Sequence, residues 1–235
     1  MALINKNQKL SDVILEDPSI ITVLNRFNIF LGVGDKTVEQ ACNEGKLNPE
    51  FFLIILNTFT NEEYFPEKLL KNFDVKLIIG YLNNTNNYYK QFIIPNIESH
   101  FNLLLKRSED DNTNLELLRK FFLEVKSELL NRIASDTNTL FKETLLLDKN
   151  KGNRLSDDDI QITNGETTDD AIEDKIDDLV NMFIIHLTGK YDTNLCVAVL
   201  FAIISLKKDL CQNNRIRNRI LMPIHHYLKS QQAND

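Results

Sequence analysis

The sequence predicts an all-α protein in which a small N-terminal helical domain precedes an up-and-down four-helix bundle. Two observations lead to this fold class. From about residue 74 onward, apolar side chains recur at steps of three and four residues, the spacing of a core-facing helix stripe. Before that point, helix caps and glycine breaks follow one another closely, which indicates short helices. No segment shows a strand alternation that rivals these patterns.

Residues 1–60 are predicted to form the small N-terminal domain. Three predicted helix starts carry a capping side chain: Asp17 before Pro18, Thr37 with Gln40 in a capping box, and Asn48 before Pro49. Gly32 and Gly34 interrupt the chain where a positive φ angle is needed. Each helix is too short to be stable alone, so we expect these helices to pack together. Residues 60–68 are interpreted as a linker.

Residues 68–235 are predicted to form the bundle. Its four helices are expected at about 74–106, 114–148, 168–188 and 193–229. Asp74 is the candidate cap of the first helix, and Pro95 should kink that helix because proline removes a backbone hydrogen bond. A polar stretch between the second and third helices is predicted to be a loop. Long amphipathic helices with such connections are typical of a four-helix bundle.

Each of the four long helices carries a polar interruption in its apolar stripe. The interrupting residues are Asn86 (or Asn87), Arg132, Asp136, Asp169, Asn213 and Arg217. Arg132 and Asp136 lie four residues apart, as do Asn213 and Arg217, so each pair shares a helix face. In an up-and-down bundle these levels would meet in one central layer, which is where such folds build metal sites.

Two helix segments carry a family resemblance. "DLCQNNRIRNRILMPI" (209–224) resembles the hemerythrin-like segment H-x-x-x-E followed by an apolar doublet and proline, with Asn213 at the His position and Arg217 at the Glu position. "LLNRIASDTNTLF" resembles the family's H-x-x-x-E-E-x-x-L-F, with Arg132 at His and Asp136 at the first Glu. The bundle is therefore expected to be hemerythrin-like.

The remaining segments extend the resemblance over nearly the whole chain. "YLNNTNNYYKQFIIPNI" resembles the family's first helix, with Asn86 at the His position, and Asp169 stands where the third helix would supply a His. "FNIFLGVGDKTVEQAC" resembles the small domain that precedes the bundle in the RIC (repair of iron centres) family. That family often has a Cys-Cys pair where Leu31 and Gly32 stand here. Membership would imply a role in repairing iron–sulfur clusters after nitric oxide or oxidative stress.

The resemblance also implies a di-iron site with four His and two carboxylate ligands, whereas the matched positions hold two Asn, two Asp and two Arg. Arginine stays protonated and cannot ligate a metal. Because the charges of the two Arg and two Asp cancel, our hypothesis is that the metal layer has become a polar network. In the alternative, Arg132 and Arg217 extend outward to solvent. We expect no catalytic, cofactor-binding or metal-binding residues and no cofactor.

Composition limits the class of protein and its partners. A net charge of −7 argues against nucleic acid as a partner, and the longest apolar run, residues 195–206, is too short to span a membrane. No signal peptide is visible, and three cysteines without metal-type spacing suit a reduced cytoplasm. His225 and His226 are interpreted as a surface pair.

We therefore expect a cytoplasmic, non-enzymatic protein of the iron–sulfur repair and nitric oxide stress family, with a degenerate metal site. It would act through a protein partner or through self-association. The apolar residues around Leu31 are candidates for such a contact, or for ordinary core. The alternative function is an iron–sulfur cluster repair protein that retains an altered metal site.

Overall fold

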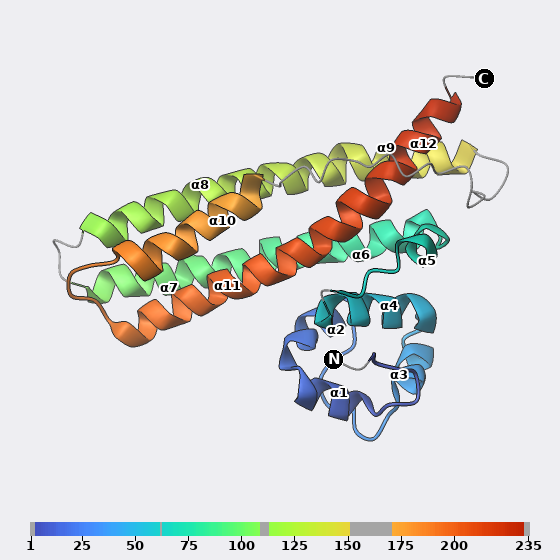
Figure 1. Ribbon diagram of the computed structural model, residues 1–235, viewed down its shortest axis with the longest axis horizontal. Coiled ribbons are helices and arrows are strands. Elements are labelled where there is room, and N and C mark those ends of the chain that lie inside the picture. The colour runs from blue at the N-terminus through green and yellow to red at the C-terminus, as the bar shows by residue number, and fades with distance from the viewer. Residues whose placement is uncertain (1–2, 62, 109–112, 151–170, 233–235) are drawn as a thin grey trace. The chain divides into compact units, whose positions relative to one another are not determined.

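The computed structural model describes residues 3–61, 63–108, 113–150 and 171–232. Helices dominate these residues, and no β-strand occurs among them apart from one isolated bridge between Lys9 and Thr37. The prediction of an all-α protein is confirmed (Figure 1). The expected loop between the second and third long helices, and Asp169 beside it, lie outside the described residues.

The chain divides into two compact units. Unit 1 comprises the described residues of Met1–Thr85, Thr144–Ile162 and Ile216–Asp235. Unit 2 comprises those of Asn86–Glu143 and Thr163–Arg215. The predicted domains, 1–60 and 68–235, are a different division of the chain and stay a prediction.

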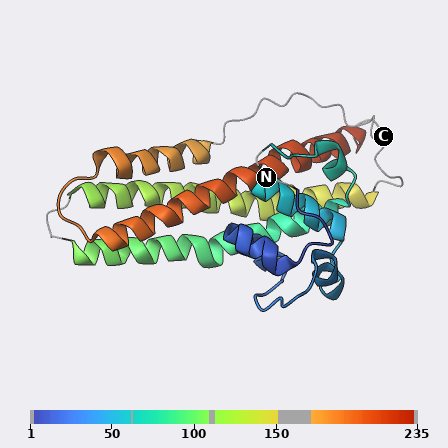
Figure 2. The same ribbon diagram turned by 60° about the horizontal axis from the view of Figure 1, so that its bottom comes forward.

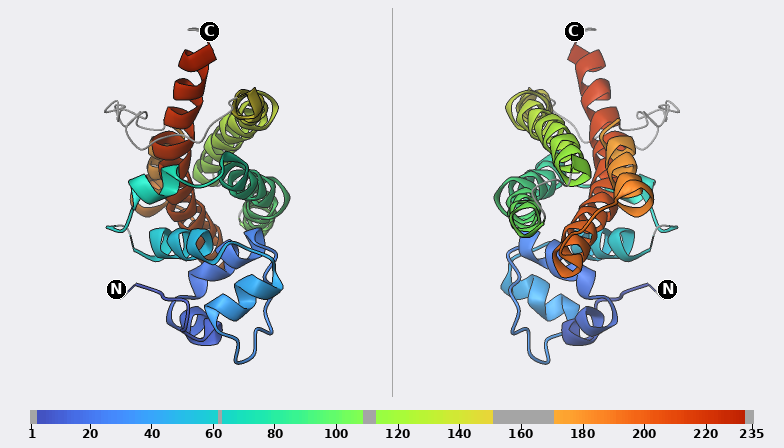
Figure 3. Two further views of the ribbon diagram at one scale, coloured as in Figure 1. Left: turned by 90° about the vertical axis from the view of Figure 1, so that its right-hand side faces the viewer. Right: turned by 90° about the vertical axis from the view of Figure 1, so that its left-hand side faces the viewer.

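Unit 1 contains the short N-terminal helices and several longer segments. Its helices are α1 (Leu10–Glu16), the 3₁₀ turn η1 (Pro18–Ile20), α2 (Ile21–Arg26), α3 (Val38–Glu44), α4 (Pro49–Thr60), α5 (Glu67–Lys71), most of α6 (Val75–Tyr88), part of α9 (Phe141–Asn150), and α12 (Met222–Gln232). Figure 3 shows α1 to α4 gathered into one small group of helices. Phe52, Ile55 and Leu56 of α4 are fully buried, so this helix supplies much of the group's core.

The caps that the sequence predicts are present. Thr37 and Gln40 form the capping box of α3, and the Asn48 side chain accepts a hydrogen bond from the Phe51 backbone N–H at 3.0 Å. Asp17 and Asp74 cap η1 and α6 in the same way. Gly32 and Gly34 have φ angles of 92° and 61°, as expected. These local rules hold because each cap satisfies backbone groups that the helix itself leaves open.

Unit 2 is built from four helical segments. These are the end of α6 with the π turn η2 (Tyr89–Ile93) and α7 (Ile94–Arg107); α8 (Thr113–Ser135) with the π turn η3 (Asp136–Leu140); α10 (Ala171–Asn181) with the π turn η4 (Met182–His186); and α11 (Thr193–Ile216). Successive segments run in opposite directions (Figures 1 and 2). When the second and fourth segments are followed along the chain into α9 and α12, the predicted helix ranges agree with the bounds of these helical runs within a few residues.

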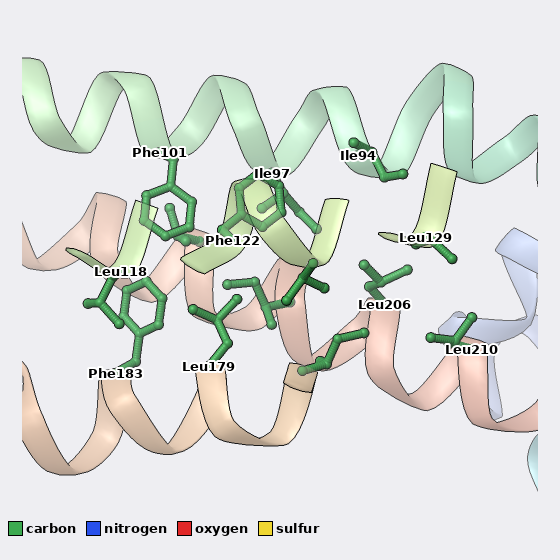
Figure 4. Packing of buried hydrophobic residues seen from close by; sticks show 14 of the residues in the cluster. Ile94, Ile97, Phe101, Leu118, Phe122, Leu129, Leu179, Phe183, Leu206 and Leu210 are labelled. Atoms are coloured by element: carbon green, nitrogen blue, oxygen red, sulfur yellow. The ribbon is translucent and has the colours of Figure 1, made fainter. Parts of the chain in front are cut away.

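One apolar cluster joins the four segments of unit 2 (Figure 4). Phe101 of α7 stacks on Phe122 of α8 at a ring-centroid distance of 5.3 Å and lies 5.5 Å from Phe183 of η4. Leu206 and Leu210 of α11 complete the cluster where it approaches the polar interruption. Within the described part of the chain, no helix is both long enough and apolar enough to cross a membrane.

Two of the π turns have a cause in the sequence. The turn η2 ends two residues before Pro95, and the π turn η5 (Arg217–Leu221) ends two residues before Pro223. A proline lacks the backbone N–H and its ring clashes with the carbonyl four residues earlier, so an inserted π turn relieves both conflicts. The kink predicted at Pro95 therefore takes the form of a π turn within one continuous helical run. No proline follows η3 or η4 at this spacing.

Candidate functional site

The candidate site is the polar segment of α11, defined here as residues 209–214. Leu206, which precedes the segment, and Leu210, which lies within it, are both buried in the unit 2 core. Four of its six residues are buried polar side chains that expose only 4–6% of their surface: Asp209, Gln212, Asn213 and Asn214. Buried polar groups are stable only when they are hydrogen-bonded, so the partners of this segment determine what it can do.

The Asn213 amide nitrogen donates to two residues, Tyr89 and Asp209. Its Nδ2 lies 3.1 Å from the Tyr89 hydroxyl and 2.7 Å from the Asp209 backbone carbonyl, and 3.4 Å from Asp209 Oδ1. Tyr89 is almost completely buried and begins η2. The first bond joins two helical runs of unit 2, and the second lies along α11. Asn213 therefore links helices through its donor hydrogens.

A second cluster lies on another face of the same segment. Glu173 of α10 accepts hydrogen bonds from the Asn214 amide nitrogen and, at 2.9 Å, from the Cys211 thiol. Burial, and then the hydrogen bond and charge of Glu173, raise the pKa of Cys211 to about 12, although the nearby Lys207 acts in the opposite direction. Cys211 therefore remains a protonated thiol at neutral pH and is a poor nucleophile.

The other residues predicted for the polar layer differ in how deeply they are buried. Asn86 is buried whereas Asn87 is half-buried, so Asn86 is the inward residue of the first segment. Asp136 is buried at the start of η3, and Arg132 is half-buried. Asp169 lies outside the described residues. The ion pairing of Arg132 with a carboxylate stays a prediction.

Arg217 belongs to unit 1, where it begins η5. It is half-buried, and its Nη1 donates to the Asn218 side-chain oxygen at 2.8 Å. Arg219, two residues further on, donates to Glu67 at 2.7 Å and lies 4.7 Å from the centre of the Phe65 ring. Glu67 also accepts from Lys71, so Arg219 is part of an ionic cluster within unit 1.

One histidine expectation is wrong. His226 is exposed, but His225 is buried and its Nδ1 lies 2.8 Å from the Thr144 hydroxyl, which is also buried. The reason is helical periodicity in α12. His225 lies four residues after Leu221 and three before Leu228, both of which are buried, so it shares their face.

The positions matched to the N-terminal cysteine pair are on the surface. Leu31 exposes 64% of its surface and the adjacent Phe30 exposes 72%. Gly32 has a φ angle of 92°, and an added Cβ there would meet no atom within 4 Å. Of the two alternatives for these residues, Phe30 and Leu31 are therefore exposed and not part of the core, whereas a docking role for them stays a prediction.

Sequence analysis missed several residues of the site. It identified Asn213 from the apolar stripe, but not Asp209, four residues earlier on the same face, nor Gln212 and Asn214 beside it. Tyr89, whose hydroxyl accepts from Asn213, was not identified as part of the site either. The run of polar residues around Asn213 was the only signal in the sequence for these buried side chains, and a run of polar residues ordinarily faces solvent.

The donor set at these positions does not fit the di-iron group that the resemblance implies. Arg132 and Arg217 offer only protonated nitrogen, and Asn213 uses its amide hydrogens on Tyr89 and Asp209. Among the described residues, no group of three or more His, Cys, Asp and Glu side chains is arranged to hold a metal ion. Comparison of the chain with protein-family models, with curated proteins and with solved structures finds no match.

Proposed function

We propose that this chain is a non-catalytic interaction protein of the hemerythrin-like kind, related to the RIC family but with a polar layer in place of its di-iron site. In this proposal, the four helical segments of unit 2 form an up-and-down hemerythrin-like bundle. Their alternating direction and shared apolar cluster support that arrangement. The cytoplasm and the response to nitric oxide stress enter the proposal through the resemblance alone.

The observation that carries the proposal is the hydrogen bonding of Asn213. This residue stands at a His position of the resemblance, and its amide nitrogen is engaged by Tyr89 and Asp209. An imidazole ligand offers a lone pair to a metal, whereas this amide offers hydrogens to oxygen acceptors. The same position thereby contributes to the stability of the bundle.

Metal analysis tests the non-catalytic assignment. The untagged protein is purified anaerobically from iron-supplemented cells, and iron per chain is measured together with the visible absorption spectrum. We expect far less than one iron per chain and no oxo-bridged di-iron bands. About two irons per chain with those bands would contradict the proposal.

Self-association is the interaction we propose, and the exposed Phe30–Leu31 pair supports it. Light scattering should give a molar mass above the 27.2 kDa of one chain, and Leu31→Glu should return the mass to that value. Leu15→Glu is the matched control, because Leu15 is also an exposed leucine of the N-terminal helices. A monomeric unmodified protein at every concentration would contradict self-association.

The alternative function, an iron–sulfur repair protein with an altered metal site, is favoured by one observation. Asp136 and Asp209 are two buried carboxylates of unit 2, and buried carboxylates are potential ligands. The iron measurement separates the alternatives, because a retained site would give reproducible stoichiometric metal that Asp209→Asn removes.

A further inference from the structure

Exposed apolar side chains lie along two helical segments of unit 2. On α11, Val197, Phe201 and Ile204 follow one another at steps of four and three residues and expose 44%, 66% and 39% of their surface. On η4, which continues α10, Ile184 and Ile185 expose 63% and 65%. We call these five residues the α10–α11 face. Steps of three and four place side chains on one side of a helix, so the α11 residues form a continuous apolar row.

Contacts between α10 and α11 show that the two parts of this face are neighbours. Asp177 forms an ion pair with Lys207, and Glu173, four residues earlier, accepts a hydrogen bond from the Cys211 thiol at 2.9 Å. Residue numbers therefore rise along α10 as they fall along α11, so the two helices are antiparallel. Two helical turns beyond the ion pair, α10 reaches Ile184 and α11 reaches its apolar row. Ile184 is therefore placed at the same level as that row.

The size of the α10–α11 face suits one helix of a partner. Large apolar side chains have surfaces on the order of 150–250 Å², so the five exposed fractions add up to about 500 Å². The largest apolar patch on a typical monomer is about 300–600 Å² and often marks an interaction site. A standard interface between two folded proteins buries roughly 800 Å² on each partner, which is more than this face offers. An amphipathic helix, which contributes one apolar stripe, matches it better.

A pair of carboxylates borders the face on α10. Asp174 and Asp178 are exposed, and neither forms an ion pair or a hydrogen bond with any other residue that the structure describes. They lie four residues apart, where two like charges repel each other on a helix. Ile185 is exposed two helical turns after Asp178, so the negative charge adjoins the apolar residues of η4. A positively charged partner would relieve the repulsion.

The basic residues near the face indicate where a partner's charges belong. Lys207 is paired with Asp177, and Lys175 is paired with Glu128 of α8. Lys208 is exposed on α11, one turn after the apolar row. At that end the α11 side of the face is therefore basic and the α10 side is acidic, so a partner's basic side chains belong over α10. The net charge of −7 over the whole chain also favours a basic partner.

We propose that the α10–α11 face docks a basic amphipathic helix of a partner protein. The apolar side of that helix lies on the five residues of the face, and its basic side chains lie over Asp174 and Asp178. The proposal rests on the interaction function proposed above and adds to it a partner other than a second copy. The Phe30–Leu31 pair belongs to unit 1 and takes no part in it.

The probe is a synthetic peptide of about 18 residues with leucine on one helix face and lysine on the other. An otherwise identical peptide with glutamate in place of lysine is the control for charge. Isothermal titration calorimetry measures binding to the full chain, and two-dimensional NMR locates it. The lysine peptide should bind saturably and shift the amide resonances of residues 174–185 and 197–208, and its affinity should fall with added salt. The glutamate peptide should bind at least about tenfold more weakly.

Four variants separate the apolar and the charged contributions. Phe201→Ser should weaken binding of the lysine peptide about tenfold, since it removes the most exposed side chain of the face. Its control is Leu146→Ser, because Leu146 is a similarly exposed apolar residue of unit 1. Asp178→Lys should weaken binding about fivefold, because it replaces an attraction with a repulsion. Its control is Glu16→Lys, which reverses the charge of an exposed carboxylate of unit 1.

The proposal is overturned if the lysine peptide does not bind saturably, or if the glutamate peptide binds equally well. It is also overturned if either control variant weakens binding as much as the variant it is matched to. If Phe201→Ser lowers the molar mass of the protein without peptide, the face binds a second copy and the proposal is again wrong. The iron content and the mass of Leu31→Glu do not depend on peptide binding, so a failure here is distinguishable from a failure of the function proposed above.

Discussion

Truncating Asn213 tests whether the polar segment of α11 stabilises the fold. Asn213→Ala removes the hydrogen bonds to the Tyr89 hydroxyl and to the Asp209 carbonyl. A typical hydrogen bond contributes about 1 kcal/mol net, so the two together give a loss of about 2 kcal/mol. Asn213 exposes only 4% of its surface, so water cannot easily replace the amide as the partner of the Tyr89 hydroxyl and the Asp209 carbonyl. A chain of this length should lose roughly 4–8 °C in Tm.

Urea unfolding followed by circular dichroism measures this loss. Tyrosine fluorescence is the second probe, because the chain has six tyrosines and no tryptophan. Asn181→Ala is the matched control, as Asn181 is an exposed asparagine at the end of α10 in the same unit. That control should change the free energy of unfolding by less than about 0.5 kcal/mol.

A double-mutant cycle with Tyr89→Phe isolates the bond between the two helical runs. Tyr89→Phe alone leaves Asn213 its bond to the Asp209 carbonyl, so the cycle reports the tyrosine contact. We expect a coupling of about 1 kcal/mol. If Asn213→Ala is no more destabilising than Asn181→Ala, or if the coupling is zero, our account of this segment as a stabilising network is wrong.

Three further predictions concern other parts of the chain. Lys46→Gly should stabilise unit 1 by ~1 kcal/mol in urea unfolding. Lys46 follows Gly45, the C-cap of α3, and its φ angle of 52° is unfavourable for a residue that has a side chain, so Lys46→Ala should give no such gain. Burial raises the pKa of Cys42 to about 11 and that of Cys211 to about 12. A thiol reagent at about pH 8 should therefore modify these two residues only after denaturation. Rapid labelling of Cys211 in the native protein would contradict its contact with Glu173. Burial alone would raise the pKa of Glu67, but its bonds to Lys71 and Arg219 lower that pKa, so the contribution of Glu67 to stability is present above its ordinary pKa and is lost as the pH falls below that value. Arg219→Ala should reduce this loss of stability in acid. An unchanged profile of stability against pH would contradict the ion pair.

The fold could be predicted from the sequence because its signals are local. A capping box needs only Thr37 and Gln40, and an N-cap followed by proline needs only Asn48 and Pro49. The long helices were located by apolar periodicity, which depends on side chains within the same helix. Lys46 shows the limit of such rules. Gly45 is the C-cap of α3 with a φ angle of −75°, and the left-handed residue is the next one, Lys46.

The site was predicted less well because it depends on neighbours that are distant in sequence. Asn213 was identified because it stands in an apolar stripe. Asn214 is equally buried because Glu173, 41 residues earlier, approaches it on another face of α11. Arg219 donates to Glu67, which lies 152 residues away in the sequence. No periodic pattern within one helix contains this information.

The π turns explain why the inward stripe was misjudged at particular residues. A π turn inserts one extra residue into the helical repeat, so the buried positions after it move by one. Across η3, the buried residues step by five, from Asp136 to Phe141. An uninterrupted helix would place Leu140, four residues after Asp136, on the inward face, but Leu140 is half-buried. Across η2 they step by five again, from Tyr89 to Ile94.

Arg217 lies at the start of another π turn. An unbroken helix would carry the stripe from Asn213 to Arg217 and on to Ile220. Ile220 is buried, but η5 begins at Arg217, and Ile216 and Leu221 are buried as well. Arg217 is half-buried, whereas Asn213, the other α11 residue of the predicted polar layer, is almost completely buried. Pro223 could have indicated this turn from the sequence, because it lies two residues beyond η5, as Pro95 does beyond η2. No such proline marks η3, so the shift at Asp136 could be found only from the structure.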